Sequence, residues 1–210
     1  MRALAAILAM ILALPLASAC VKLERQPIEK RFYALETVRP VAAVAASPGP
    51  AAAPGVLLVR RLVVSPRATG RELVYRTAPG VWSADYYNVY FVAPADMLTQ
   101  DLRAWLGAAG VCAEVVDPSS LVGHDYILEG NVTSLHGDLT AKPAEAVVEM
   151  QFLLLKAGGD ERKVLLTRGY RKTAPLASNT PQELIRAQRE AVAAVYAQLE
   201  ADLRAALPKK

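Results

Sequence analysis

The C-terminal stretch 180–207, TPQELIRAQREAVAAVYAQLEADLRAAL, predicts one long amphipathic helix. Thr180-Pro181-Gln182-Glu183 has the form of a capping box with a proline at the first helical position. The apolar residues of one stripe are Leu184, Ala191, Val195, Leu199 and Leu203, widened by Val192, Ala206 and Leu207. The charged residues expected on the solvent side are Glu183, Arg186, Arg189, Glu190, Glu200 and Arg204. Because such a stripe must be buried, the rest of the chain has to supply an apolar surface.

A second helix is predicted over 94–109. Leu98, Leu102, Trp105 and Ala109 fall on one side of it at helical spacing. Pro94 suits the first helical turn, and Gly110 suits the position just after the helix end. This helix also needs an apolar surface to cover.

Short strands occupy most of the remaining chain. The predicted strands are 32–35, 56–64, 72–76, 86–92, 111–116, 126–134, 146–155 and 162–172. Polar and apolar residues alternate in 126–134 and 146–155, which indicates antiparallel strands with one face in water. Arg60-Arg61 interrupts 56–64, so that strand is either an edge or bulged. We therefore expect an α+β fold: a two-layer domain with a mixed, mostly antiparallel sheet and both helices on one face.

The first 19 residues have the features of a secretory signal peptide. Met1-Arg2 is followed by an apolar run over 3–14 and by the small residues 17–19 before Cys20. The run is too short for a comfortable transmembrane span, which needs roughly 20 residues. Cys20 resembles the lipidated cysteine of a bacterial lipobox, although Ala17 stands where leucine is usual. The alternative is a soluble periplasmic protein with a free N-terminal thiol. By analogy with bacterial sorting rules, Val21 in place of aspartate predicts an outer-membrane lipoprotein on the periplasmic face.

Residues 20–55 are expected to connect this anchor to the domain at 56–207. The part at 21–31 is charged, and the part at 37–55 is rich in alanine and proline, which excludes a helix or a central strand. Twelve residues from Cys20 to Phe32 span at most about 40 Å. The short strand 32–35 either crosses back to join the sheet or stays in the tether.

Composition excludes several function classes. The chain has 210 residues, of which 53% are hydrophobic and 21% charged, with a net charge of +4, so it is globular and too weakly basic to predict nucleic-acid binding. The nucleotide-binding loop G-x-x-x-x-G-K-[ST], the nucleophile motif G-x-S-x-G and the zinc motif H-E-x-x-H are all missing from the sequence. We expect no catalytic residue, no metal and no cofactor.

His124-Asp125 and His136-Gly137-Asp138 each place a possible base beside a carboxylate. The simpler interpretation is that these are polar loop residues that flank a strand. Cys112, in an apolar run, is expected to be buried.

The segment 82–91 concentrates five aromatic residues. Trp82, Tyr86 and Tyr90 are the candidate partner-binding residues, because tyrosine and tryptophan combine apolar area with a polar group. The alternative is that Tyr87, Val89 and Phe91 pack under the first helix while Tyr86 and Tyr90 line the wet face. A basic set that could meet acidic groups or simply protect strand edges comprises Arg60, Arg61, Arg67, Arg71 and Arg76.

Together these parts resemble the ABC-type transport auxiliary lipoproteins, which include the lipoprotein of the paraquat-inducible MCE system. The resemblance rests on Cys20, the strand Phe32-Tyr33-Ala34-Leu35, the strands 56–59 and 72–76, the helix opening at 94–98, Gly130-Asn131-Val132 and the final helix. Segments 67–71 and 89–93 depart from the usual family pattern.

The resemblance implies a non-catalytic component of an ABC/MCE system that moves lipids or other hydrophobic molecules. Its implied partners are an MCE-domain protein and the ABC permease and ATPase, with membrane attachment through the lipid and a possible homo-oligomer. The alternative is an outer-membrane lipoprotein that regulates cell-wall synthesis or envelope assembly. A periplasmic enzyme is a third possibility that no group of residues favours.

Overall fold

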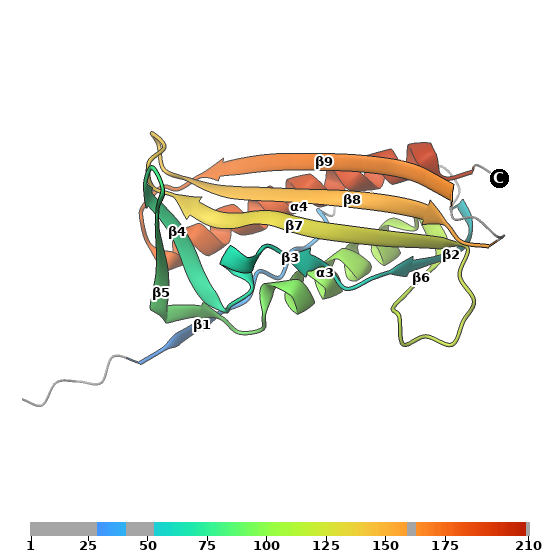
Figure 1. The fold of residues 1–210 in the computed structure, drawn as a ribbon, viewed down its shortest axis with the longest axis horizontal. Helices are drawn as coiled ribbons and strands as arrows, with labels where there is room; N and C mark the ends of the chain where they lie inside the picture. The colour runs from blue at the N-terminus through green and yellow to red at the C-terminus, as the bar shows by residue number, and fades with distance from the viewer. Residues whose placement is uncertain (1–28, 41–52, 159–162, 209–210) are drawn as a thin grey trace, which may run out of the picture.

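The described part of the chain folds as a curled nine-stranded sheet with two α-helices on one face (Figure 1). The structure, a computed structural model, describes residues 29–40, 53–158 and 163–208. The strands are β1 (Arg31–Tyr33), β2 (Ala53–Val59), β3 (Val63–Val64), β4 (Glu72–Ala78), β5 (Val81–Tyr90), β6 (Cys112–Val116), β7 (Tyr126–Asp138), β8 (Glu145–Lys156) and β9 (Lys163–Pro175). The helices are η2 (Pro66–Ala68), α3 (Pro94–Ala109) and α4 (Pro181–Ala206). The α+β architecture and both long helices agree with the sequence-based predictions.

Strand β7 organises the sheet. One of its edges pairs antiparallel with β8 along the whole strand, and β8 pairs antiparallel with β9. Its other edge is shared by three shorter strands, β2, β3 and β4, which all run parallel to it. Beyond them, β6 extends one end of the sheet, while β5 and β1 extend the other. The sheet is therefore mixed, and its longest pairings are antiparallel.

The predicted strand 56–64 is divided in two. It begins at Ala53 and breaks between β2 and β3, at Arg60–Leu62. Leu62 turns inward, where a side chain on Gly130 would collide with it, since an added Cβ would lie 2.4 Å from the Leu62 side chain. Both interpretations of 56–64 hold in part: β2 pairs with both β6 and β7 and is not an edge, whereas β3, after the break, pairs with β7 alone among the described strands.

The helix ends follow the sequence signals. Gly110 adopts a left-handed conformation with φ of 62° at the end of α3. At the start of α4, the Thr180 hydroxyl accepts a hydrogen bond from the Glu183 backbone N–H at 3.4 Å. The Glu183 carboxylate, however, accepts from the backbone N–H of Ala177 and from Arg186. Only the threonine half of the predicted capping box therefore appears among the hydrogen bonds of the described residues.

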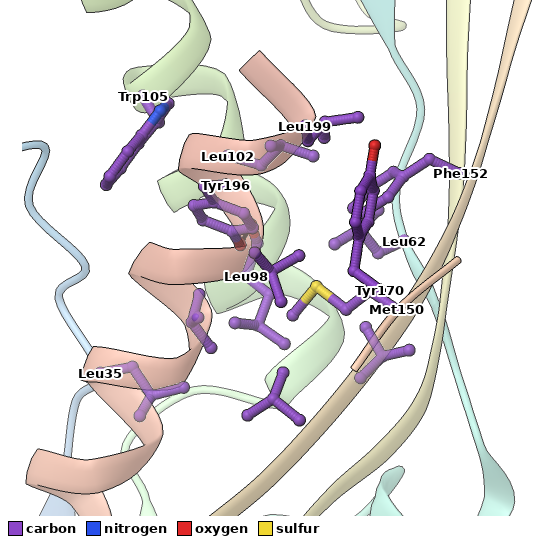
Figure 2. Close-up of a cluster of buried hydrophobic side chains, with 14 of the residues drawn as sticks. Leu35, Leu62, Leu98, Leu102, Trp105, Met150, Phe152, Tyr170, Tyr196 and Leu199 are labelled. Atoms are coloured by element: carbon purple, nitrogen blue, oxygen red, sulfur yellow. Dashed lines mark hydrogen bonds between the residues drawn. The ribbon is translucent and has the colours of Figure 1, made fainter. Parts of the chain in front are cut away.

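The core lies between the sheet and the two helices (Figure 2). Leu98, Leu102 and Trp105 of α3 meet Tyr196 and Leu199 of α4 there, and the Trp105 and Tyr196 rings lie 5.7 Å apart. The sheet contributes the buried side chains Val148, Met150, Phe152 and Leu154 from alternate positions of β8. This alternation explains why the helix face of the sheet is continuous and apolar.

Residues 31–39 pack onto the domain, which settles the question left open for 32–35. Strand β1 pairs parallel with β5, and Leu35 beyond it is fully buried beside α4 (Figure 2). The Thr37 backbone N–H donates to Asp101 of α3 at 2.9 Å, and Arg39 forms a bidentate ion pair with Glu200 of α4. We call residues 34–39 the strap, because they lie against both helices.

The solvent side predicted for α4 needs one correction. Glu200 is largely covered, with 12% of its side chain exposed, and it accepts hydrogen bonds from Arg39, Trp105 and Arg204. Hydrogen bonds from Arg39 and Trp105 outweigh the opposing effect of burial and lower the pKa of Glu200. Arg189 likewise donates to the Leu35 carbonyl in the strap. The strap thus uses charged residues that the helical pattern alone places in water.

None of the helices that the structure describes is both long and apolar enough to cross a membrane. The predicted signal peptide 1–19, Cys20 and most of the linker 37–55 lie outside the described residues.

Candidate functional site

The face of the sheet that the helices leave uncovered, here called the open face, is polar and hollowed. On β8, Glu149, Gln151 and Leu153 point to this side, alternating with the buried core residues. A groove of about 750 Å³ lies there, lined by Arg60, Arg61, Val63, Pro118, Glu129, Gly130, Asn131, Gln151, Phe152, Leu153 and Thr167. Its volume lies within the range of small-molecule binding sites.

Charged pairs line the groove. Arg60 donates to Glu129 of β7 at 2.7 Å, and Arg61 forms two hydrogen bonds with Asp96 of α3. Exposed pairs such as these contribute little to stability. These two members of the basic set named from the sequence therefore have carboxylate partners, and they are accessible to a ligand. A third member, Arg76, pairs with Asp138.

Trp82 occupies the other end of the open face. Its ring packs edge-on against His136 of β7 with centroids 4.8 Å apart, and the Arg67 guanidinium lies 5.2 Å from the ring centre. The tryptophan keeps 38% of its surface exposed, whereas His136 keeps 8%. Burial lowers the pKa of His136, so the imidazole is neutral near pH 7.

The two histidine–carboxylate neighbours serve the structure. Asp138 accepts hydrogen bonds from the backbone and hydroxyl of Thr140 and from Arg76. Asp125 accepts from the Val56 backbone N–H at 2.8 Å. Each carboxylate is thus engaged in holding a loop or a strand, which favours the structural interpretation of both pairs. Burial raises the pKa of the Cys112 thiol to about 11, so this buried cysteine is a poor nucleophile.

A large bulge in β5 decides where its aromatic residues point. Asp85 pairs with Leu73 of β4, yet the next paired residue, Val89, lies opposite the adjacent Glu72. The Asp85 carboxylate accepts from the backbone N–H groups of Tyr87 and Asn88, and from the Asn88 side chain at 2.8 Å. These hydrogen bonds hold the extra residues in place, so that Tyr86 and Tyr87 protrude from the sheet.

The placement of Tyr90 on the wet face is wrong. Tyr90 is 2% exposed, and its hydroxyl donates to the Gln188 side chain of α4 at 2.7 Å. Burial raises the pKa of Tyr90 well above its ordinary value. The other placements of that alternative hold only in part: Val89 is buried and Tyr86 is exposed as expected, but Tyr87 and Phe91 are exposed and not packed under the helix. The bulge changes the alternation, and the signal for it was the Asp85…Asn88 pair inside an apolar run.

The bulge and strand β1 together form a second surface, which we call the aromatic edge: Phe32, Tyr86, Tyr87 and Phe91. Phe32 and Phe91 meet edge to face at 6.2 Å, and Tyr86 and Tyr87 do so at 5.2 Å. Lys30 lies over the Tyr86 ring at 3.9 Å, and Arg71 lies over the Phe32 ring at 5.4 Å. Phe32 is not among the surface residues predicted from the sequence, because the pairing of β1 with β5 is a long-range contact. Phe91 belongs to the aromatic segment 82–91, which the sequence marks as a candidate surface.

The structure therefore separates the three predicted partner-binding residues. Trp82 belongs to the open face, Tyr86 to the aromatic edge and Tyr90 to the core. Within the described ranges, no group of three or more His, Cys, Asp or Glu side chains is arranged to hold a metal ion.

Comparison with known families identifies the chain. The family described as the ABC-type transport auxiliary lipoprotein component matches residues 33–200. The chain belongs to this family. The ABC-type transport auxiliary lipoproteins are described as an auxiliary component of ABC-type transport. The matched region contains the open face, all but one residue of the aromatic edge and most of α4.

Solved structures share the fold at low sequence identity. A crystal structure of a DUF330 protein from Xanthomonas campestris is 20% identical, covering 73% of this chain and 85% of that chain with a TM-score of 0.64. Another crystal structure, of an uncharacterized protein, is 19% identical, covering 83% of this chain and 99% of that chain, also with a TM-score of 0.64. The crystal structure of the lipoprotein GNA1162 from Neisseria meningitidis is 14% identical and covers 70% of this chain and 99% of that chain, with a TM-score of 0.38. A search of curated protein sequences gives no match.

Proposed function

We propose that this family member is a lipid-anchored, non-catalytic component of an ABC/MCE-type envelope transport system for lipids or other hydrophobic compounds. The match to the auxiliary family over 33–200 is the observation that carries the proposal. Cys20, directly after a run of small residues, supplies the proposed lipidation site. The anchor would hold the domain on the periplasmic face of the outer membrane, because Val21 is not aspartate.

Its proposed partners are the MCE-domain protein and the ABC permease and ATPase of the same system. The open face supports this assignment, because it combines an accessible tryptophan, a groove of about 750 Å³ and charged side chains that are not part of the core. Tryptophan and arginine are the residue types that most often dominate protein interfaces. We place the protein partner on the open face, where it would cover the surface around Trp82 and Arg67 at one end and the groove at the other.

Co-purification tests the transport role. The chain is expected to bring down MCE and permease subunits from solubilised envelopes, in amounts comparable to the bait. Recovery of cell-wall synthases in their place would favour the alternative of an envelope regulator. The mass of the purified chain in detergent, measured by light scattering, tests the proposed homo-oligomer.

Fatty-acid labelling tests the anchor separately. The wild-type chain should incorporate a labelled acyl chain, and the Cys20→Ala variant should not. Equal labelling of both chains, or of neither, would remove Cys20 as the lipidation site. Absence of label from both would favour the alternative of a soluble periplasmic protein with a free N-terminal thiol.

A further inference from the structure

The exposed aromatic side chains of the described residues all lie on β5, on β1 or one residue beyond β5. They are Phe32, Trp82, Tyr86, Tyr87 and Phe91. Trp82 packs on the open face against His136, which leaves the other four together as the aromatic edge. Phe32, Tyr86 and Phe91 keep 54%, 64% and 66% of their surface exposed. Soluble monomers rarely leave such apolar area in water without a use.

Cations accompany these rings. The Lys30 ammonium lies over the Tyr86 ring and the Arg71 guanidinium over the Phe32 ring, and Arg31, the first residue of β1, directly follows Lys30. The acidic side chains of the same region are Glu29, Glu72 and Asp85, of which Asp85 is bound to the backbone of the bulge. Exposed aromatic rings bordered by lysine and arginine are the combination that settles at the headgroup level of a bilayer.

The position of this surface along the chain favours a membrane over a protein. The aromatic edge is built around β1, the first described strand, and Cys20 precedes Phe32 by twelve residues. That segment reaches at most about 40 Å. A lipid on Cys20 therefore keeps this edge close to the bilayer, at a high effective concentration that makes weak surface contacts sufficient.

We propose that the aromatic edge rests on the surface of the membrane that holds the N-terminal lipid, with Phe32, Tyr86 and Phe91 at the headgroup level and Lys30 beside anionic phosphates. This inference rests on the proposed lipid anchor. It fixes the orientation of the domain: β1 and the bulge of β5 face the bilayer, and the loop between β6 and β7 lies at the opposite end of the molecule (Figure 1). The open face then remains free for the transport partner.

Tethered vesicles test this orientation independently of lipidation in the cell. The chain from residue 20 onward, with an N-terminal hexahistidine in place of the acyl group, is bound to vesicles of phosphatidylethanolamine, phosphatidylglycerol and a nickel-chelating lipid. The vesicles contain brominated acyl chains, which quench nearby tryptophan. Phe91→Trp is compared with Leu121→Trp, a matched control in which a fully exposed apolar residue of the β6–β7 loop is replaced. Both variants keep the same native tryptophans.

The proposal predicts several-fold stronger quenching of the added tryptophan in Phe91→Trp than in Leu121→Trp. Equal quenching in the two variants, or none in either, would overturn it. Protection of the Phe91 position by a purified transport subunit without lipid quenching would also overturn it, since this edge would then be a protein interface. Because the hexahistidine replaces the acyl group, failure here leaves the lipidation of Cys20 standing, and failure of lipidation leaves this result standing.

Two further variants separate apolar from ionic contact. Without the tether, Phe32→Ser with Tyr86→Ser should lower the vesicle partition constant at least about tenfold. Lys30→Glu should weaken binding to phosphatidylglycerol vesicles and leave binding to neutral phosphatidylcholine vesicles unchanged. Unchanged partition of the double serine variant, confirmed as folded by circular dichroism, would contradict the proposal.

Discussion

The two faces of strand β8 differ in the burial and in the role of their side chains. Met150 and Phe152 are almost fully buried beneath the helices, whereas Gln151 between them lies exposed at the groove. The helix face takes its stability from close packing, and changes there act on folding. The open face carries polar groups and ion pairs that the fold tolerates, so changes there should act on binding. Adjacent residues in one strand can therefore have different roles: one side chain stabilises the core and the next is available for binding.

The largest contrast is expected on helix α4. Leu199→Asp places an unpaired carboxylate in the core, where its cost of several kcal/mol approaches the whole stability of a small domain. Gln198→Asp introduces the same charge one residue earlier, at an exposed position. Circular dichroism and urea unfolding should show the first variant unfolded and the second close to wild type. Equal stability of the two would contradict the division into a buried and an open side.

Strand β5 offers the same contrast between two tyrosines. Tyr90→Ser removes a buried ring and the hydrogen bond to Gln188, at a cost of about 4 kcal/mol. Tyr86→Ser removes an exposed ring and should change the free energy of unfolding by less than about 0.5 kcal/mol. Urea denaturation midpoints measure both. A Tyr86→Ser variant as unstable as Tyr90→Ser would show that the bulge is wrongly placed.

The sequence was most informative where a single local pattern determines the element. The stripe of Leu98, Leu102 and Trp105, together with Gly110, predicts both ends of α3 correctly. Thr180 and Pro181 likewise predict the start of α4. The bulge in β5 was missed because Asp85 holds it through short-range hydrogen bonds that interrupt the two-residue period. Tyr90 was therefore placed on the wrong face.

The packing of the strap against the helices could not be predicted from local sequence patterns, for a different reason. Its contacts with Asp101 and Glu200 join residues far apart in the chain, and nothing in an Ala/Pro-rich stretch predicts which helix it meets. Of the candidate site, Trp82 and Tyr86 were named from the sequence as surface aromatics. Phe32 joined them only through the pairing of β1 with β5.

The strap supplies the next prediction. Leu35→Ala opens a cavity at a fully buried position and should lower the free energy of unfolding by about 3 kcal/mol. Val38→Ala, three residues on, changes a side chain that is 74% exposed and should be nearly silent. Thermal unfolding measures both changes. A silent Leu35→Ala would mean that the strap is not part of the folded domain.

The smallest expected effect depends on pH. The pKa of Glu200 is lowered below its ordinary 4.5 in the folded chain, so its contribution to stability is present above about pH 4.5 and is lost as the pH falls through the folded pKa. Glu200→Gln cannot ionise and should be less stable than wild type by about 1 kcal/mol at neutral pH. Urea unfolding from pH 3 to 7 should show this difference shrinking below pH 4.5. A constant difference would place the effect in packing and not in the ion pair with Arg39.

The central claim is that the open face binds a transport partner while the helix face only maintains the fold. Quantitative co-purification of the MCE and permease subunits with Trp82→Ser tests it most directly, with Glu190→Ser on the solvent side of α4 as the control. We predict that Trp82→Ser stays folded and loses most of the bound subunits, at a cost of about 2 kcal/mol or roughly thirtyfold in affinity, while Glu190→Ser retains them. Full recovery of the subunits by a folded Trp82→Ser variant would contradict the claim.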